Sequence, residues 1–203
     1  MIGIIDYGLG NLRSVLGAVE KLGHQGTISA DAAGLAGCDK LILPGVGAFG
    51  DGMGNLRGRG LIEPLTEMVR LQRKPILGIC LGFQLLAETS EEFGAHEGLG
   101  WIPGHVKRIR PGDSDLRVPH VGWNDFERTG DCILFDELPN PALFYFVHSY
   151  HLETDAAITM GTCTYGRPLT AAVQAGNVFG TQFHPEKSQQ HGLHVLRNFL
   201  ERA

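Results

Sequence analysis

The chain has 203 residues, of which 43% are hydrophobic and 19% charged, and its formal net charge is −5. This length and apolar content suit one domain with a substantial core, so we expect residues 1–203 to form a single domain. The acidic balance argues against a nucleic-acid-binding protein. We find neither an apolar stretch of the roughly 20 residues that span a bilayer nor the basic region of a secretory signal. We therefore expect a cytoplasmic protein that does not bind membranes.

The first half of the chain alternates short apolar runs with segments of helical periodicity. We expect strands at 2–5, 26–29, 40–43 and 75–79, and helices at 12–22, 61–71 and 81–88. Gly23 is expected to end the first helix and Pro44 the third strand. This rhythm predicts a parallel sheet with helices on both faces. Ligands bind beyond the carboxyl ends of such strands, which points to the turns after Ile5, Leu43 and Ile79.

The pattern changes after about residue 96 to short β-like pieces separated by turns. These pieces cover 104–109, 120–126, 143–148, 159–165, 169–174 and 178–183, and a final helix is expected at 191–202. They predict either an antiparallel extension of the same sheet or a second small sheet. The expected fold class is therefore α/β, a mostly parallel doubly wound sheet with an antiparallel extension.

The segment Gly78-Ile79-Cys80-Leu81-Gly82 has the form of a nucleophile elbow with cysteine in place of serine. A nucleophile on a tight strand-to-helix turn has a strained backbone and needs small neighbours two positions away on either side. The turn places the sulfur at the start of a helix, where free amides favour the thiolate and the Leu81 amide can bind an oxyanion. The alternative is that Cys80 is a small buried hydrophobic residue, as most free cysteines are.

A thiol nucleophile needs a base, and His184-Pro185-Glu186 supplies one after the last predicted strand. Residues two apart on an extended chain point the same way, so Glu186 can hold one tautomer of His184. Pro185 is expected to keep this stretch out of a helix. We therefore predict a Cys80–His184–Glu186 triad. The remaining cysteines lack the short spacing of a zinc site, and we interpret them as packing residues: Cys38, Cys132 and Cys163.

The stretch Pro44-Gly45-Val46-Gly47-Ala48-Phe49 follows the third predicted strand. Glycines on either side of Val46 leave a peptide free to present amides to an anion or to rotate. Simple turn formation is the alternative explanation.

Together, Gly-x-Cys-x-Gly and His-Pro-Glu at this separation resemble the class I (triad) glutamine amidotransferases, and the resemblance covers essentially the whole chain. Three further stretches are similar to the glutaminase subunits of imidazole glycerol phosphate synthases, from histidine biosynthesis: Asp6-Tyr7-Gly8-Leu9-Gly10-Asn11, residues 44–49 and His120-Val121-Gly122-Trp123-Asn124.

The resemblance implies hydrolysis of glutamine to glutamate and ammonia through a cysteinyl thioester. It implies a heterodimer in which ammonia passes through a channel to a (β/α)₈-barrel cyclase subunit, with no cofactor and no metal. Oxyanion and substrate contacts would come from Val46, Gly47, Leu81, Gln84, Ser149 and Tyr150. Partner contacts would come from Asn11, Trp123, Tyr145 and Lys187. Gln84 also lies one helical turn beyond Cys80, whereas Trp123 could equally belong to the core.

We hypothesise that the Gly45–Val46 peptide turns only when partner and substrate are bound, which would leave the isolated subunit nearly inactive. Two other functions stay open. One is the glutaminase of another pathway, such as vitamin B6, anthranilate or nucleotide synthesis, which residues 6–11 and 120–124 argue against. The other is a non-enzymatic cysteine sensor or chaperone on a similar sheet, which would have no use for an oriented base such as His184.

Overall fold

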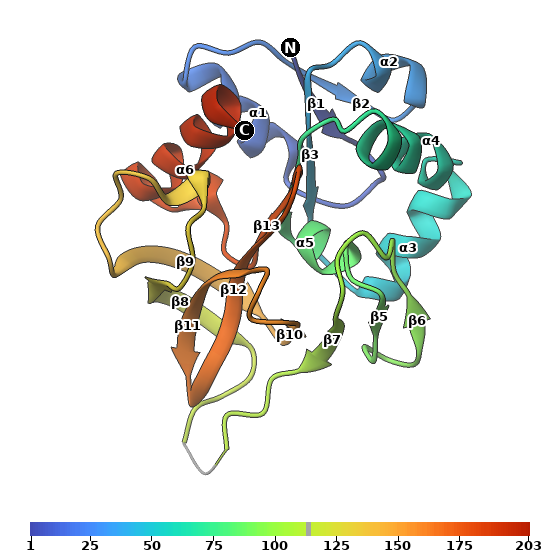
Figure 1. Ribbon diagram of the computed structural model, residues 1–203. Helices are drawn as coiled ribbons and strands as arrows, with labels where there is room; N and C mark the ends of the chain where they lie inside the picture. Colours follow the sequence, from blue (N-terminus) through green and yellow to red (C-terminus); the bar gives the residue numbers. More distant parts are fainter. Residues whose placement is uncertain (113–114) are drawn as a thin grey trace.

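The computed structural model describes residues 1–112 and 115–203. In this part of the chain, a nine-stranded sheet has the order β2-β1-β3-β4-β13-β12-β11-β8-β9 (Figure 1). The first five strands in this order are parallel, and the others extend the sheet antiparallel. The strands are β1 (Ile2–Ile5), β2 (Gly26–Ser29), β3 (Lys40–Gly45), β4 (Ile76–Cys80), β8 (His120–Arg128), β9 (Ala142–His148), β11 (Thr159–Tyr165), β12 (Arg167–Ala175) and β13 (Val178–Thr181). The predicted α/β fold with an antiparallel extension is confirmed.

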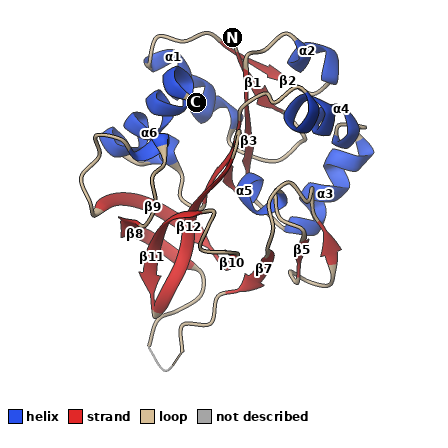
Figure 2. Cartoon of the chain, viewed as in Figure 1, coloured by secondary structure: helices blue, strands red, loops and turns tan. Residues whose placement is uncertain are grey.

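Helices cover both faces of the parallel part of the sheet (Figure 2). One face carries α1 (Leu12–Lys21) and α6 (Gln189–Arg202), and the other carries α2 (Ala32–Ala36), α3 (Phe49–Gly58), α4 (Ile62–Thr66) and α5 (Leu81–Leu85). Shorter turns are the π-helical η1 (Glu67–Leu71) and the 3₁₀ turns η2 (Ile133–Phe135) and η3 (Pro185–Lys187). Among residues 1–112 and 115–203, no helix has both the length and the hydrophobicity needed to cross a bilayer.

Alternation along the strands divides the core into two layers. Ile4 of β1 faces the α1 and α6 layer, where Val19 and Phe199 are fully buried. Leu43 of β3 faces the opposite layer together with Leu56 of α3. Each such side chain contributes about 1.5–3 kcal/mol by leaving water, so the two layers fix the sheet between its helices.

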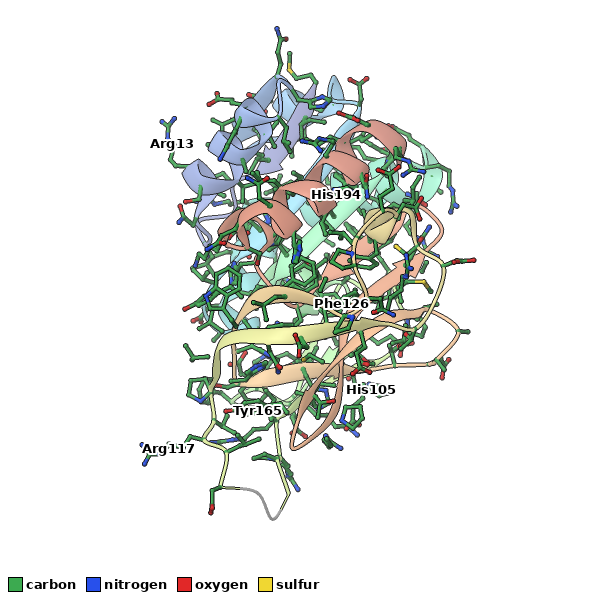
Figure 3. All side chains as sticks on the ribbon, turned by 90° about the vertical axis from the view of Figure 1, so that its left-hand side faces the viewer. Arg13, His105, Arg117, Phe126, Tyr165 and His194 are labelled. Atoms are coloured by element: carbon green, nitrogen blue, oxygen red, sulfur yellow. The ribbon has the colours of Figure 1, made fainter. Side chains whose placement is uncertain are left out.

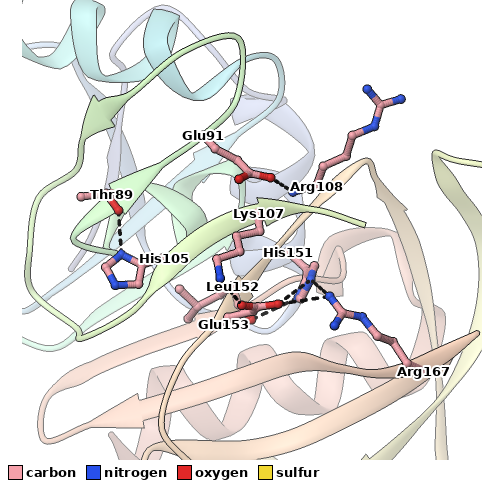
Figure 4. Close-up of polar contacts among 9 residues, drawn as sticks. All are labelled: Thr89, Glu91, His105, Lys107, Arg108, His151, Leu152, Glu153 and Arg167. Atoms are coloured by element: carbon pink, nitrogen blue, oxygen red, sulfur yellow. Dashed lines mark hydrogen bonds and ion pairs between the residues drawn. The ribbon is translucent and has the colours of Figure 1, made fainter. Parts of the chain in front are cut away.

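A smaller sheet, of order β10-β7-β5-β6, packs beside the large one and comprises β10 (Tyr150–Glu153), β7 (His105–Arg108), β5 (Thr89–Ser90) and β6 (His96–Glu97). Glu153 joins the two sheets, since it pairs with Lys107 of β7 at 2.6 Å and with Arg167 of β12 at 3.1 Å (Figure 4). The antiparallel part of the sheet also contacts the loop before β8. The hydroxyl of Tyr165, at the end of β11, donates a hydrogen bond to the Arg117 carbonyl in this loop at 2.6 Å (Figure 3). The second half of the sequence therefore forms both structures that were considered as alternatives, an antiparallel extension of the large sheet and a second small sheet.

Two expectations about proline are wrong. Pro44 does not end β3, which continues to Gly45 while paired with β4. The pairing of β3 with β1 stops at Ile42, so one side of β3 is open at this point and can accommodate a residue without a backbone N–H. Pro185 does not exclude helix either, because it begins the 3₁₀ turn η3, where a fixed φ suits the first position and no amide donor is needed.

The helix expectations also need correction. Helix α5 ends at Leu85, earlier than predicted, and residues 32–36 and 49–58 form α2 and α3, which the sequence pattern did not indicate. Four glycines in α3 lower its helix propensity, but Phe49, Met53 and Leu56 lie on one buried face and stabilise it by packing. A side chain on Gly50 would meet the His96 ring at 2.7 Å, so this ring would have to move to admit one.

Candidate active site

The end of β4 and the start of α5 form the tight turn that the glycine spacing predicted. Cys80 is the last residue of β4 and has φ +54° and ψ −108°, a backbone conformation that L-residues rarely adopt. A Cβ on Gly82 would overlap the Leu43 carbonyl oxygen, and one on Gly78 would lie 2.8 Å from the Gly82 oxygen. Both glycines are therefore required sterically, as predicted, and the turn holds the Cys80 side chain at the carboxyl edge of the sheet.

His184 reaches the same edge because β13 lies directly beside β4 in the sheet. The two strands are parallel, with Thr181 in register with Ile79, so both chains leave the sheet at the same end. His184 follows β13 in extended conformation, and its backbone N–H donates to the Tyr145 carbonyl of β9 at 3.0 Å. Cys80 and His184 consequently line one pocket although they are far apart in the sequence.

Glu186 stands behind His184 and holds its ring. The distance between His184 Nδ1 and Glu186 Oε1 is 2.8 Å, and both side chains are almost completely buried. Nδ1–H donates a hydrogen bond to the carboxylate, so Nε2 is the ring nitrogen free to act in chemistry. Nε2 is buried and has no hydrogen-bond partner of standard geometry among the described residues. The predicted support of His184 by Glu186 is thus present, although it is achieved on a 3₁₀ turn rather than on an extended chain.

The charges around His184 favour its protonated form. Burial opposes the imidazolium, but the contacts with Cys80 and Glu186 outweigh burial and raise the pKa of His184 to about 9. The ring is therefore a proton donor at neutral pH as long as the sulfur beside it carries a negative charge. Once that charge is removed, part of the stabilisation of the imidazolium is lost, so the pKa of His184 falls and more of the ring is in the neutral form that can accept a proton.

The pocket around Cys80 has a volume of about 290 Å³, at the small end of ligand-binding cavities. Its walls contain the predicted catalytic residues Cys80 and His184. They also contain all the predicted oxyanion and substrate residues, which are Val46, Gly47, Leu81, Gln84, Ser149 and Tyr150. Four further lining residues were not predicted: Glu92, Pro119, Val147 and His148. In the described part of the chain, no group of three or more His, Cys, Asp or Glu side chains is arranged to bind a metal ion.

The predicted oxyanion turn lies over the elbow. Gly45 is in register with Cys80 at the end of β3, Val46 is 41% exposed, and Gly47 has φ +114°. The turn rests on the N-terminal segment, because the buried Tyr7 hydroxyl occupies the space that a side chain on Gly45 would need. Among the described residues this hydroxyl has no hydrogen-bond partner. The turn is therefore packed from below but open to the pocket above.

Glu92 is a functional candidate that the sequence did not indicate. It follows the two-residue strand β5, and its Oε2 accepts the backbone N–H of Phe49 at 2.7 Å. Burial raises the pKa of Glu92, but the Phe49 N–H and nearby His96 act in the opposite direction. No local pattern points to this residue, since the chain reverses between Cys80 and Glu92 and only the small sheet brings the carboxylate back to the pocket.

The predicted partner residues lie outside the pocket on the neighbouring surface. Trp123 of β8 is 44% exposed, which excludes the alternative that this tryptophan belongs to the core. Its ring packs edge-on against Tyr145 of β9, with 6.0 Å between the ring centroids. Lys187 is exposed on η3, next to Glu186, and Asn11 is the exposed N-cap of α1, where it accepts the Ser14 N–H at 3.3 Å.

Comparisons with known proteins identify the family of the chain. The sequence profile of the family described as glutamine amidotransferase class-I matches residues 3–203. The chain is 51% identical over 205 residues to the "Imidazole glycerol phosphate synthase subunit HisH" of Syntrophotalea carbinolica, with 98% of each chain covered. It is 50% identical over 201 residues to the "Imidazole glycerol phosphate synthase subunit HisH 2" of Vibrio vulnificus, with 98% of this chain and 94% of that one covered.

Solved structures share the fold at lower sequence identity. A structure described as a glutamine amidotransferase superposes with a TM-score of 0.77 at 21% identity and covers 98% of this chain and 97% of that one. The structure of PurLQS from Thermotoga maritima gives a TM-score of 0.76 at 20% identity, and the match covers 98% of this chain and 96% of that one. At these identities the likeness establishes the architecture and not the reaction.

Proposed function

The chain belongs to the class I glutamine amidotransferases, and from this premise we propose that it is the glutaminase subunit of an imidazole glycerol phosphate synthase. The names of its relatives support the assignment to this synthase, which belongs to histidine biosynthesis. The observation that carries the chemistry is the shared pocket of Cys80 and His184, with Glu186 bonded behind the ring. The expected cytoplasmic location is part of the same proposal.

In the first half of the proposed reaction, the Cys80 thiolate attacks the side-chain amide carbon of glutamine. The carbonyl oxygen becomes an oxyanion, which the amide of Leu81 and an amide from the turn at Val46 and Gly47 bind. When the intermediate collapses, the C–N bond breaks and protonated His184 gives its proton to the departing nitrogen, so ammonia leaves and a γ-glutamyl thioester remains.

In the second half, water cleaves the thioester. Forming the thioester removes the negative charge on sulfur that helps to keep His184 protonated, so the ring, having donated its proton, can now act as the base. His184 takes a proton from water, the hydroxide adds to the thioester, and the C–S bond breaks to release glutamate and the Cys80 thiolate. Glu186 stabilises the imidazolium in each half through its 2.8 Å bond.

The pocket offers acceptors for the α-ammonium group of glutamine. Both amide hydrogens of Gln84 are donated within the protein, to the Tyr150 carbonyl and to Gln182 Oε1, so only its own carbonyl oxygen is left for a ligand. Glu92 supplies a carboxylate in the same wall. We propose that Gln84 and Glu92 together bind the ammonium, which orients the amino-acid end away from Cys80.

The change Glu92→Gln tests this assignment because it keeps the shape of the side chain and an acceptor for the Phe49 N–H. Losing a charged partner for the ammonium should raise the KM for glutamine about tenfold or more and change kcat much less. Steady-state glutaminase kinetics measure both constants. Glu20→Gln, on the exposed face of α1, is the matched control. An unaltered KM in the Glu92 variant would remove Glu92 from the binding site.

We propose that the cyclase subunit, a (β/α)₈ barrel, docks as the second half of a heterodimer on the surface formed by Asn11, Trp123, Tyr145 and Lys187. An exposed tryptophan beside a tyrosine is typical of interface anchors. The surface is also tied to the active site, since the Tyr145 carbonyl accepts the His184 backbone N–H.

The experiment that tests the proposed function is a glutaminase assay of the purified chain, alone and with the cyclase subunit and its ligand. We expect glutamate release to be low for the chain alone, because the Gly45–Val46 peptide presents its amide only in the complex, and to rise on adding the ligand-bound cyclase. Losing one oxyanion donor typically lowers the rate by about 10²–10³, which sets the size of the stimulation. Absence of glutamate formation in the complex would exclude the proposal, and full turnover without the partner would exclude the proposed rotation.

A further inference from the structure

A buried backbone carbonyl next to the pocket fixes the orientation of two side chains directly and, through them, of their hydrogen-bond partners. The Tyr150 oxygen lies 2.9 Å from Gln84 Nε2 and 2.8 Å from His148 Nδ1. A carbonyl oxygen can only accept hydrogen bonds, so Gln84 must point its amide nitrogen at Tyr150 and His148 must carry its proton on Nδ1. These assignments need no observed hydrogen atoms, because only one arrangement satisfies them.

On one side, the arrangement runs outward through two histidines. With its proton on Nδ1, neutral His148 accepts at Nε2, and His120 Nδ1 lies 2.9 Å away as the donor. His120 Nε2 is then an acceptor and receives Asn124 Nδ2 at 3.2 Å. Burial lowers the pKa of His148 to about 3 and that of His120 to about 4, so both rings carry a single proton at neutral pH and fit this assignment.

On the other side, the arrangement runs inward to the sulfur of Cys80. Gln84 Nε2 also lies 3.0 Å from Gln182 Oε1, so this oxygen of Gln182 is the acceptor and its amide nitrogen must face the opposite way. That nitrogen lies 3.8 Å from Cys80 Sγ. Gln182 is fully buried on the segment between β13 and His184, so it cannot turn to solvent instead.

The sulfur therefore meets two unlike groups besides His184. It lies 3.8 Å from the Val147 carbonyl oxygen, which can accept a thiol hydrogen but repels a thiolate. The Gln182 amide group can donate to a thiolate, and its hydrogen bond strengthens when the acceptor is charged. The Val147 carbonyl is thus a partner for the thiol, whereas the Gln182 amide is a partner for the thiolate, which is the nucleophilic form.

We infer that Gln182 is a catalytic residue of the glutaminase reaction, whose amide hydrogen stabilises the Cys80 thiolate and whose orientation is imposed by Gln84 through the Tyr150 carbonyl. The inference deepens the proposed function and rests on Cys80 as nucleophile. It assigns to Gln182 a contact with the reacting atom itself, in addition to the contacts of His184 and the oxyanion donors.

The test compares Gln182→Glu, which replaces the donor by an acceptor of the same shape, with Gln182→Met, which removes it. Alkylation of Cys80 by iodoacetamide is followed against pH in the full chain, with Cys80→Ala giving the background of the other cysteines. We expect half-maximal alkylation to move to higher pH in both variants, and the rate at neutral pH to fall about tenfold. The exposed Gln25→Glu is the matched control and should leave the profile unchanged.

Glutaminase kinetics in the complex with the cyclase give the second readout. Loss of thiolate stabilisation lowers kcat about tenfold with little change in KM. A raised KM with unchanged kcat and an unchanged alkylation profile would show that Gln182 only shapes the pocket, which overturns the inference. Since alkylation needs no glutamine, it reports on Gln182 even if the glutaminase proposal fails.

A measurement on the unaltered side chain covers the case in which neither variant folds, as judged by thermal melting. The two side-chain amide protons of Gln182 are observed by NMR while Cys80 is titrated. We expect the proton facing the sulfur to shift as the thiolate forms, and to show no such titration in Cys80→Ala. A Gln182 amide signal that is indifferent to Cys80 would overturn the inference on its own.

Discussion

Replacing Cys80 by alanine should abolish glutamine hydrolysis while leaving the fold intact. The reaction proposed above has no other group that could form the thioester, so we expect the rate in the activated complex to fall by at least ~10⁴, the scale of nucleophile removal in other hydrolases. Glutamate release measured with and without the cyclase gives the value. Cys38→Ala, which alters a buried cysteine outside the pocket, should keep the activity. Residual turnover in Cys80→Ala close to that of the unaltered chain would exclude the covalent mechanism.

The same variant should change the protonation of His184 in a known direction. Burial lowers the pKa of this ring, and Cys80 and Glu186 raise it to about 9. Without Cys80, one of the two groups that favour the imidazolium is missing, so the titration midpoint of His184 must move to lower pH. NMR of the imidazole resonances measures this midpoint. An unmoved midpoint would mean that the sulfur and the ring do not interact.

A second large effect is expected for Gly82→Ala, on stability rather than on catalysis alone. The added methyl group would overlap the Leu43 carbonyl oxygen, and this atom belongs to a central strand that cannot move freely. Overpacking of this kind typically costs about 1–3 kcal/mol and more where backbone must shift, so we expect a loss of about 3 kcal/mol or more in the free energy of unfolding. Urea denaturation measures this loss as a lower midpoint of unfolding, and an unchanged m-value would show that the change is in stability.

Gly17→Ala is the matched control for this substitution. Gly17 lies in the exposed face of α1, and a Cβ there meets no atom within 4 Å. Alanine should stabilise that helix by about 0.5–1 kcal/mol, opposite in sign to the Gly82 variant. If both variants lose stability equally, the contact with Leu43 is not the cause, and the steric explanation of the glycine spacing fails.

Local signals in the sequence were sufficient for the elements whose pattern is strong. The apolar runs of β1 and β4 and the periodicity of α1 are visible without knowledge of the fold, and Gly78 and Gly82 mark the elbow by their spacing from Cys80. Helix α3 could not be found in this way, because its glycines are typical of loops and only the surrounding packing makes them helical.

The site was predictable where it depends on neighbours in sequence and not where it depends on strand order. His184 and Glu186 are two positions apart, so their contact could be anticipated, but nothing local places β13 against β4 rather than at an edge of the sheet. Long-range pairing brings Glu92 to the pocket and Gln182 to the Cys80 sulfur, and single-sequence patterns do not encode such pairing. Their roles could be proposed only from the arrangement of hydrogen bonds around them.

The position of β13 also bears on how the molecule is made. This strand follows the other strands in chain order, yet it fills the place between β4 and β12 and joins the parallel and antiparallel parts of the sheet. During synthesis, the ribosome would release β4 long before β13, whereas β12 directly precedes β13 in the chain, so the open edge of β4 must wait for the β12–β13 pair. Such a high contact order slows folding. The enzyme therefore gains its base and its completed sheet in one late step, and a nascent chain lacking that step would have the nucleophile but no means to use it.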